Sequence, residues 1–320
     1  MVVAATDQLT EHRVLREGCG LLDGSERGKL ALIGAGAKEF LNGQVSNDVE
    51  ALAPGEGLYA ALLTHKGKML ADVRVLDLGD ELFLDTERVA LQDLFNQIRR
   101  AQIGYDVEMH KRTLERGLLS LIGPRAAQVA GVPQLSGEHS NAAGEIAGVP
   151  VRFVATDAGV DLICDSEQTA ELAAALRDRG AVEVAESAAE CLRVERGRPR
   201  YGIDMDAATI PQEAGINERA VSFTKGCYVG QETVARLHYR GKPNRHLRGL
   251  LLSAPVQTGT ELRLGDKAVG SVGSVAVSPA LGPIALALVR REAEPGAALT
   301  VGEEGVEGTV VALPFDGGGG

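Results

Sequence analysis

An internal near-repeat is the feature of this sequence that most restricts its fold. Residues 29–45 (KLALIGAGAKEFLNGQV) and 117–132 (GLLSLIGPRAAQVAGV) each run an apolar strand into a glycine-marked turn and then into a helix. The matching positions Ile33 and Ile122 lie 89 residues apart. A unit of this size with one strand and one helix repeated predicts two related structural halves.

A second pair of segments, residues 80–109 and 159–184, repeats a different plan of strand, helix cap, amphipathic helix and strand. Asp85 and Asp165 hold equivalent places 80 residues apart, and each is expected to cap the helix that follows it. Together the two repeats predict an α+β fold with two ferredoxin-like sibling lobes, each an antiparallel sheet with helices on one face.

From about residue 245 the chain changes to short alternating runs separated by Gly and Pro, which predict a small C-terminal β-barrel. The closing DGGGG has too little apolar surface to bury and is expected to be mobile. The expected boundaries are 1–113 with parts of 185–244 for the first lobe, 114–184 for the second lobe, 245–315 for the barrel and 316–320 for the mobile tail.

Composition excludes several classes of protein. The 320 residues are 44% hydrophobic and 24% charged, which is ordinary for a globular chain of two or three units. No apolar run approaches the roughly 20 residues that cross a bilayer, and the N-terminus lacks the pattern of a signal peptide, so we expect a cytoplasmic protein without membrane contact. The four cysteines are scattered without a CxxC, which predicts neither disulfides nor a metal site.

Positive charge is concentrated in one region. The formal net charge is −11, yet residues 193–248 hold 11 Lys and Arg against 6 Asp and Glu. General nucleic-acid binders are usually broadly basic, so this local concentration favours a pocket for an anionic ligand or partner.

Residues 225–236, KGCYVGQETVAR, place a solitary cysteine beside a lysine in a turn with two glycines. Lys225 and a helix that begins near Gln231 would favour the reactive thiolate form of Cys227. An isolated cysteine is more often a small buried residue, and both interpretations stay open from this segment alone.

Two acidic residues stand where a carboxylate is costly or unusual. Asp72 lies among apolar neighbours in a predicted strand, so it either faces solvent or lines a pocket against a polar ligand nitrogen. Glu195 lies between Arg193 and Arg196 at the end of a helical stretch. It either makes surface ion pairs or accepts two parallel hydrogen bonds from a heterocycle such as a pterin or guanine.

In sequence order these motifs resemble the YgfZ-type folate-binding proteins, relatives of the glycine-cleavage aminomethyltransferase (T-protein). The resemblance rests on KGCYVGQETVAR followed by RGKPNR, and on the segments 41–49, 65–75, 193–204 and 210–227. It covers most of residues 25–250 and, more weakly, the β-rich end. The resemblance implies a cloverleaf of two related lobes and a β-barrel around a central channel that binds tetrahydrofolate or a folate derivative.

The resemblance also implies roles for single residues. Asp72 matches the acid of the pocket, and Glu195 matches the pterin-binding glutamate. Three more residues fall in segments that line the channel or meet the glutamyl tail of the folate: Tyr201, Arg236 and Arg245. Cys227 becomes the reactive or cluster-interacting thiol, and Lys225 becomes its electrostatic activator.

Two departures from the T-protein pattern favour the YgfZ branch, whose role is linked to assembly or repair of iron–sulfur enzymes and to tRNA modification. This chain has Ala71 and Asp72 where the T-protein pattern has paired acids, and that pattern lacks the cysteine of Lys-Gly-Cys. We therefore expect a tetrahydrofolate-binding protein that supports iron–sulfur enzymes and contacts their assembly proteins or the client enzymes themselves. Classical turnover is not required by this interpretation.

Two alternatives stay open. In the first, the protein is a folate-dependent one-carbon transferase of the aminomethyl type, in which Asp72 orients a folate nitrogen and assists proton movement. In the second, the protein is a tRNA-modification factor that binds RNA through the basic segment, which predicts a steep salt dependence of binding.

Overall fold

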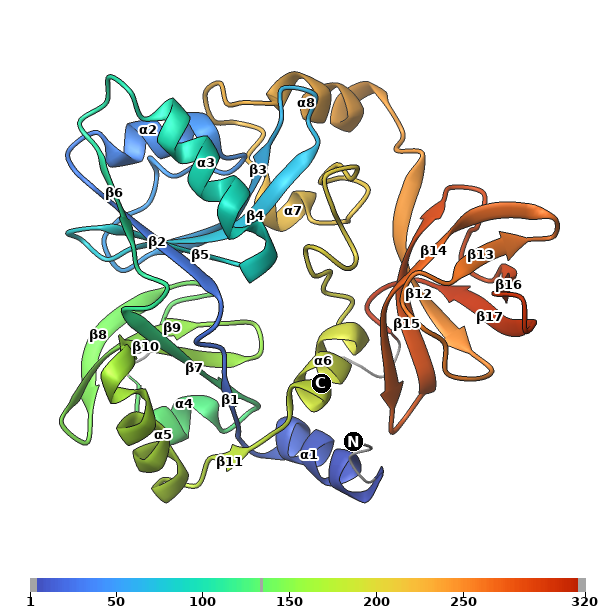
Figure 1. Ribbon diagram of the computed structural model, residues 1–320, viewed down its shortest axis with the longest axis horizontal. Helices are drawn as coiled ribbons and strands as arrows, with labels where there is room; N and C mark the ends of the chain where they lie inside the picture. The colour runs from blue at the N-terminus through green and yellow to red at the C-terminus, as the bar shows by residue number, and fades with distance from the viewer. Residues whose placement is uncertain (1–4, 133–134, 316–320) are drawn as a thin grey trace.

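The computed structural model describes residues 5–132 and 135–315, and three sheets organise this part of the chain (Figure 1). The first is five-stranded, in the order β3-β4-β5-β2-β6, and every neighbouring pair in it is antiparallel. Its strands, with two of the helices that pack on it, are β2 (Gly28–Ile33), α2 (Ala37–Gln44), β3 (Gly57–Leu63), β4 (Met69–Asp77), β5 (Leu82–Thr86), α3 (Leu91–Ala101) and β6 (Glu108–Lys111).

The second sheet is six-stranded, in the order β11-β1-β7-β10-β9-β8, and only the short β1–β11 pair in it is parallel. Its elements are β1 (Gly20–Asp23), β7 (Arg116–Ile122), α4 (Ala126–Ala130), β8 (Asn141–Ile146), β9 (Val149–Ala155), β10 (Gly159–Asp165), α5 (Thr169–Asp178) and β11 (Val182–Glu183). Because β1 pairs with β7, this N-terminal strand belongs to the second sheet, although the expected boundary had assigned residues 1–113 to the first lobe.

The predicted repeat is visible in the backbone of both lobes. Gly34 ends β2 with φ 131, and Gly123 ends β7 with φ 123, at equivalent places before α2 and α4. A Cβ at Gly34 would lie 2.3 Å from the Asp106 carbonyl oxygen, and one at Gly123 would lie 2.6 Å from that of Gly18. Each turn therefore needs glycine, for its positive φ and for the close approach of a neighbouring backbone.

The predicted helix caps are wrong in detail. After β5 and β10 the chain enters short 3-10 turns, η1 (Arg88–Ala90) and η2 (Ser166–Gln168), before α3 and α5 begin. Neither Asp85 nor Asp165 caps a helix with its side chain. Asp85 instead ion-pairs with two arginines, and Asp165 ion-pairs with Arg116, because a nearby guanidinium is a stronger donor than a backbone N–H.

The C-terminal part is a closed six-stranded barrel, as the alternating pattern predicts. Its strands are β12 (Arg245–Leu252), β13 (Glu261–Leu264), β14 (Lys267–Ser278), β15 (Gly282–Arg290), β16 (Ala298–Val301) and β17 (Val306–Val311). The structure is thus a mixed α+β fold of two lobes plus a barrel. The predicted mobile tail at 316–320 lies outside the described residues.

The remaining helices join the three bodies, and Figure 1 shows them between the lobes and the barrel. They are α1 (Ala5–Glu17), α6 (Glu186–Glu195), α7 (Asn217–Ala220) and α8 (Gln231–Arg240). Helix α6 packs on β14 and β15 of the barrel on one side and on α1 on the other. Among the helices of the described residues, none has the length and apolar character needed to cross a membrane.

Candidate functional site

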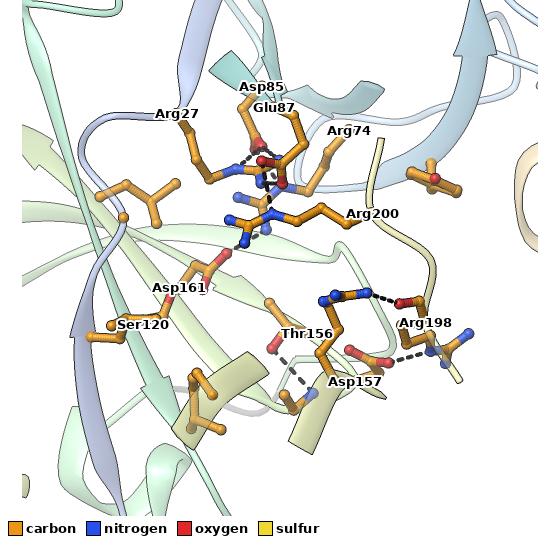
Figure 2. A pocket seen from close by; sticks show the side chains of 18 of the residues that line it. Arg27, Arg74, Asp85, Glu87, Ser120, Thr156, Asp157, Asp161, Arg198 and Arg200 are labelled. Atoms are coloured by element: carbon orange, nitrogen blue, oxygen red, sulfur yellow. Dashed lines mark hydrogen bonds and ion pairs between the residues drawn. The ribbon is translucent and has the colours of Figure 1, made fainter. Parts of the chain in front are cut away.

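A cavity of about 390 Å³ lies between the two lobes and the segment that continues from α6. Figure 2 shows its walls, which come from β4 and β5 of the first lobe, β7 and β10 of the second, and residues 193–200. Its volume falls in the range of small-molecule sites, which lie preferentially between structural units. The cavity is therefore the candidate functional site.

Asp72 on β4 lines this cavity beside Tyr59 on β3. The strand register places Tyr59 opposite Arg74 and Ala61 opposite Asp72, so the Tyr59 and Asp72 side chains share one face of the sheet. The Tyr59 hydroxyl donates to Asp72 Oδ2 at 2.8 Å, while Oδ1 has no hydrogen-bond partner among the described residues. Burial of the carboxyl group raises the pKa of Asp72 to about 6, so it can exchange a proton near neutral pH.

An ion-pair network joins the two lobes at the floor of the cavity. Arg74 Nε donates to Asp85 Oδ2 at 2.5 Å, and Arg74 Nη1 donates to Asp161 Oδ2 of the second lobe at 2.6 Å. Arg27 Nη2 donates to Asp85 Oδ1 at 2.7 Å (Figure 2). Burial alone would raise the pKa of Asp85, but Arg74 and Arg27 outweigh it and lower the value to about 2. The network holds the opposing walls of the cavity in register.

Two arginines of the cavity have no carboxylate partner among the described residues, namely Arg88 and Arg196. Arg196 Nη1 donates to the Asp157 carbonyl oxygen, at 3.1 Å. The other arginines that line the cavity are each paired with a carboxylate. Arg88 and Arg196 are therefore the groups available for an anionic part of a ligand.

Several polar atoms without a hydrogen-bond partner in the described chain lie around the same cavity. Besides Asp72 Oδ1, both ring nitrogens of His139 and Nε of Arg219 are buried without a hydrogen-bond partner within the described chain. Buried polar groups normally have partners, and unpaired ones call for an explanation. An acceptor, a neutral ring and a cationic donor around one cavity suit a polar ligand that carries both donors and acceptors.

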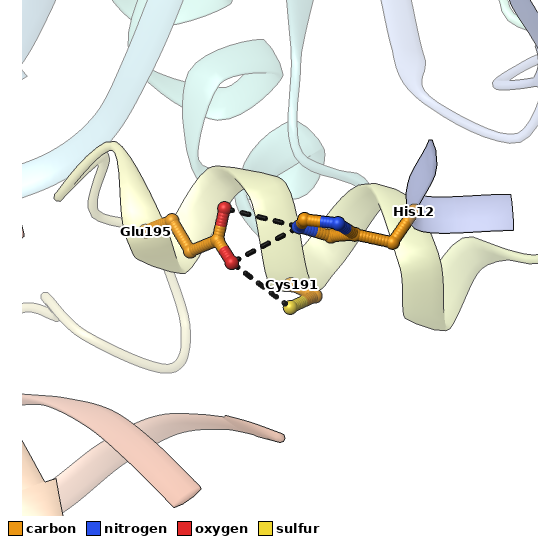
Figure 3. Close-up of side chains that lie close together, drawn as sticks. All are labelled: His12, Cys191 and Glu195. Carbon is orange, nitrogen blue, oxygen red and sulfur yellow. Dashed lines mark hydrogen bonds and ion pairs between the residues drawn. The ribbon is translucent and has the colours of Figure 1, made fainter. Parts of the chain in front are cut away.

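Glu195 lies outside this cavity, in a separate buried cluster at the end of α6 (Figure 3). Its carboxylate is 3.0 Å (Oε1) and 3.2 Å (Oε2) from His12 Nε2, and it accepts from Arg16 at 3.1 Å and from Ser278 Oγ at 2.6 Å. The Cys191 thiol lies 3.7 Å from Oε1. The pterin-binding role of Glu195 stays a prediction, and it would require Glu195 to leave these partners.

The Glu195 cluster also brings together three possible metal ligands. One donor atom each from His12, Cys191 and Glu195 lies within 4.8 Å of the others. The Arg16 guanidinium occupies the same carboxylate and would repel a cation. The carboxylate already has four neighbours that satisfy it, so the cluster is complete as a hydrogen-bond network and does not call for an ion.

The chain matches two family models that together span nearly all of it. The model of the GCVT N-terminal domain matches residues 4–225, and that of the glycine cleavage T-protein C-terminal barrel domain matches residues 245–316. The chain belongs to the glycine cleavage T-protein family. These matches agree with the two lobes and the closed barrel of the structure.

Relatives of this T-protein family member are aminomethyltransferases. It is 27% identical to that of Corynebacterium jeikeium, over 98% of this chain and 92% of the relative. It is 30% identical to that of Rubrobacter xylanophilus, over 95% and 85%. The crystal structure of the glycine cleavage system aminomethyltransferase T from Bartonella henselae superimposes with a TM-score of 0.85 at 26% identity, over 96% of this chain and 89% of that one. The YgfZ-type assignment stays a prediction.

Lys225 and Cys227 of this family member differ in their surroundings: the lysine is buried and the cysteine is exposed. Lys225 Nζ is buried and donates to the carbonyl oxygens of Asn42, Val45 and Asn47 at 2.6, 3.0 and 2.7 Å. Burial lowers the pKa of Lys225 to about 8. Cys227 is exposed just before α8, which begins at Gln231 as expected. The ammonium thus hydrogen-bonds carbonyl oxygens in the last turn of α2 and in the loop that follows it, and the activation of the Cys227 thiol stays a prediction.

The other three residues implied by the family resemblance also lie away from the cavity. Tyr201 is 7% exposed and packs in the core of the first lobe. Arg236 is exposed on α8. Arg245 Nη2 lies 2.7 Å from Glu213 Oε2, an ion pair at the start of the barrel. Sequence reasoning missed the residues that do line the cavity with Asp72, namely Tyr59, Arg27, Arg74, Arg88, His139, Asp161, Arg196 and Arg219.

Proposed function

We propose that the protein binds tetrahydrofolate in the cavity between its lobes and uses it in one-carbon transfer of the aminomethyl type. The observation that carries this proposal is the carboxyl group of Asp72, which accepts from Tyr59 at Oδ2 and whose Oδ1, beside the cavity, has no partner in the part of the chain that the structure describes. The relatives named aminomethyltransferase along nearly the whole chain support the same function.

Asp72 supplies the proton chemistry of this function. A secondary amine of the reduced pterin that attacks an activated one-carbon unit loses its N–H proton when the new C–N bond forms. A carboxylate with a pKa of about 6 can accept that proton near neutral pH and pass it to solvent or to the departing amine. The Tyr59 hydroxyl fixes the orientation of the carboxyl group, which leaves Oδ1 as the oxygen that meets the ligand.

The free arginines supply affinity for the folate tail. The glutamyl part of a folate carries carboxylates, and guanidinium groups bind carboxylates through paired hydrogen bonds. Arg196 and Arg88 line the cavity without a carboxylate partner in the described ranges, so either can bind a tail carboxylate without breaking an existing ion pair. The pterin then lies toward Asp72 and the tail toward the arginines.

Titration calorimetry with tetrahydrofolate and a transfer assay with a lipoylated carrier test this function. Asp72→Asn keeps the size of the side chain, so we expect affinity within about threefold of wild type while transfer falls about 100-fold or more, as for loss of a general base. Asp178→Asn, at the exposed end of α5, is the matched control and should change neither property. Absence of tetrahydrofolate binding by the wild-type protein would contradict the proposal.

A second candidate function, support of iron–sulfur enzymes by a folate-binding protein, is favoured by the exposure of Cys227. This thiol is exposed, whereas Cys19, Cys164 and Cys191 are buried. One cysteine does not hold a cluster that usually takes four ligands, so its role would be a transient contact or thiol exchange with an assembly protein or a client enzyme.

Cells lacking the gene, complemented with wild type, Cys227→Ala or Thr224→Ala, separate the two candidates. Under the iron–sulfur function, Cys227→Ala fails to restore the activities of iron–sulfur enzymes although folate still binds. Thr224→Ala, an exposed neighbour in the same turn, restores them. Under the transferase function, Cys227→Ala leaves transfer to tetrahydrofolate nearly intact.

The tRNA-binding alternative gains no comparable support. Within the basic segment, Arg193, Arg200, Arg219 and Arg245 are each paired with a carboxylate, which leaves fewer cations to contact phosphates. Binding of tRNA with a steep salt dependence would restore this alternative.

A further inference from the structure

His139 faces the cavity from the lobe opposite Asp72, in the turn that leads into β8. Its backbone conformation is unusual, with φ 68, and Ala147 is the other non-glycine residue with positive φ in the described chain. A side chain at such a φ strains the backbone, and glycine or asparagine would adopt it more easily. A histidine with positive φ beside a cavity is therefore a residue whose side-chain surroundings call for inspection.

The imidazole of His139 makes no hydrogen bond within the described residues. Both ring nitrogens are buried without a hydrogen-bond partner among the described residues, and the side chain is 12% exposed. The nearest carboxylate oxygen, Glu138 Oε1, is 3.5 Å from Nε2 and already accepts from Arg219 Nη2. Burial and the positive charge of Arg74 lower the pKa of His139 to about 4. The ring is therefore neutral at physiological pH, with one nitrogen that donates and one that accepts.

The turn that carries His139 is fixed against the first lobe. The N–H of His139 donates to the Ala155 carbonyl oxygen at 2.8 Å, and the N–H of Asn141 donates to that of Gly55 at 2.7 Å. A Cβ at Gly57, at the start of β3, would lie 2.7 Å from the His139 carbonyl oxygen. The backbone of His139 therefore lies directly against the start of β3, the strand that carries Tyr59.

We propose that His139 is a ligand-binding residue whose neutral imidazole hydrogen-bonds the pterin ring of the folate bound against Asp72, so that both lobes hold the same ring. This inference rests on the proposed function. A neutral donor and acceptor suits the uncharged amide and amine edge of a pterin, whereas the carboxylate tail suits the free arginines. Ligand binding would give the two ring nitrogens the hydrogen-bond partners that they lack among the described residues.

Calorimetric titration with tetrahydrofolate and with 6-methyltetrahydropterin, which lacks the tail, tests the proposal. His139→Gly tolerates the positive φ and removes the ring, so we expect an affinity about tenfold lower for both ligands, the effect of one lost hydrogen bond. His139→Asn tolerates the same φ and keeps an amide donor and acceptor, so its loss should be smaller, about threefold. Ala147→Gly, in the exposed turn between β8 and β9, relieves the same kind of strain away from the cavity and should leave affinity unchanged.

Melting temperatures of the variants separate a binding role from a structural one. Because glycine relieves the strain, His139→Gly should melt no lower than wild type while it binds more weakly. Equal affinity of wild type and His139→Gly overturns the inference. A lower melting temperature of His139→Gly also overturns it, since the ring would then stabilise the turn. Absence of binding by the wild-type protein counts against the proposed function itself.

Discussion

Asp72 and Glu195 are two interior carboxylates that differ in how completely the protein hydrogen-bonds them. Glu195 is 1% exposed and surrounded by His12, Arg16 and Ser278, with the Cys191 thiol close by. The Asp72 carboxyl group accepts a hydrogen bond from the Tyr59 hydroxyl, and its Oδ1, beside the cavity, has no hydrogen-bond partner among the described residues. The first arrangement is what stability requires of a buried charge, and the second is what a ligand-binding or proton-accepting group requires.

The difference between the two carboxylates separates a structural role from a functional one. A satisfied buried carboxylate stabilises the contacts around it, here those among α1, α6 and β14. A buried carboxylate without a partner lowers the free energy of unfolding, and a ligand that donates a hydrogen bond to it offsets this cost. The two residues should therefore respond to substitution with opposite signs in stability.

Glu195→Ala should give the largest effect. The substitution leaves His12 and Ser278 without their acceptor and opens a small void, so we expect a loss of about 4 kcal/mol in the free energy of unfolding. Because a chain of three bodies need not unfold in one step, scanning calorimetry is the appropriate measurement. Glu190→Ala, one turn earlier on α6 and partly exposed, should cost much less.

The tetrahydrofolate affinity of Glu195→Ala tests whether Glu195 has a structural role, unlike Asp72, or binds the ligand. Measured well below the melting temperature, it should stay within about twofold of wild type, because Glu195 does not line the cavity. A tenfold loss would show that Glu195 leaves its cluster to bind the pterin, as the family resemblance implies.

Asp72→Asn should give the next largest effect, with the opposite sign. The pKa of Asp72 is raised from 3.8 to about 6, so the folded protein holds this proton more tightly than the unfolded chain does. The contribution of Asp72 to stability therefore falls as the pH rises from about 4 through about 6. The carboxyl group is enclosed although the residue retains some exposure, so we expect a cost of roughly 2 kcal/mol at pH 7.5.

Asn carries no charge, so Asp72→Asn should be more stable than wild type at pH 7.5 and equal to it near pH 4. Thermal melts across this pH range measure the difference, with Asp178→Asn as the control that should show none. A variant less stable than wild type at pH 7.5 would mean that the Asp72 carboxylate has a structural partner in solution.

The fold could be read from the sequence because its signals are local. The turns at Gly34 and Gly123 lie at the same place in each repeat. The barrel is indicated by short runs of alternating apolar and polar residues between turns. Asp72 could be found for the same reason, since a charge among apolar strand residues is visible in a window of a few residues.

The rest of the site depends on contacts between distant segments. Arg74 and Asp161 are 87 residues apart, and Glu195 meets His12 across 183 residues, so no short pattern reveals either pair. Lys225 is the opposite case, in which closeness in the sequence to Cys227 led us to expect an interaction between the two side chains. The side chain of Lys225 hydrogen-bonds instead the backbone at the end of α2 and in the loop after it, 178 to 183 residues earlier.

Tyr59→Phe removes the hydrogen bond that the Tyr59 hydroxyl donates to Asp72 Oδ2. That bond stabilises the ionised carboxylate and lowers the pKa of Asp72, so its loss should move the pKa further above its usual range. The free energy of unfolding should fall by about 1 kcal/mol at pH 7.5, because the buried carboxylate loses its donor. The measurement is the pH dependence of melting relative to Asp72→Asn, whose midpoint should shift upward, and an unchanged midpoint would mean that the tyrosine does not bind the carboxylate.

Cys227→Ala should have the smallest effect on stability, because substitutions of exposed side chains usually change the free energy of unfolding by less than about 0.5 kcal/mol. Its effect on thiol chemistry should nevertheless be complete. Of the four cysteines, three are buried, and burial raises the pKa of Cys19 to about 11 and that of Cys191 to about 12. In the native protein a disulfide reagent such as DTNB should modify one thiol rapidly, and none in Cys227→Ala. Rapid modification of a second thiol would mean that a buried cluster, such as the one around Glu195, opens in solution, and the distinction between a satisfied and an unsatisfied carboxylate would then hold for only part of the time.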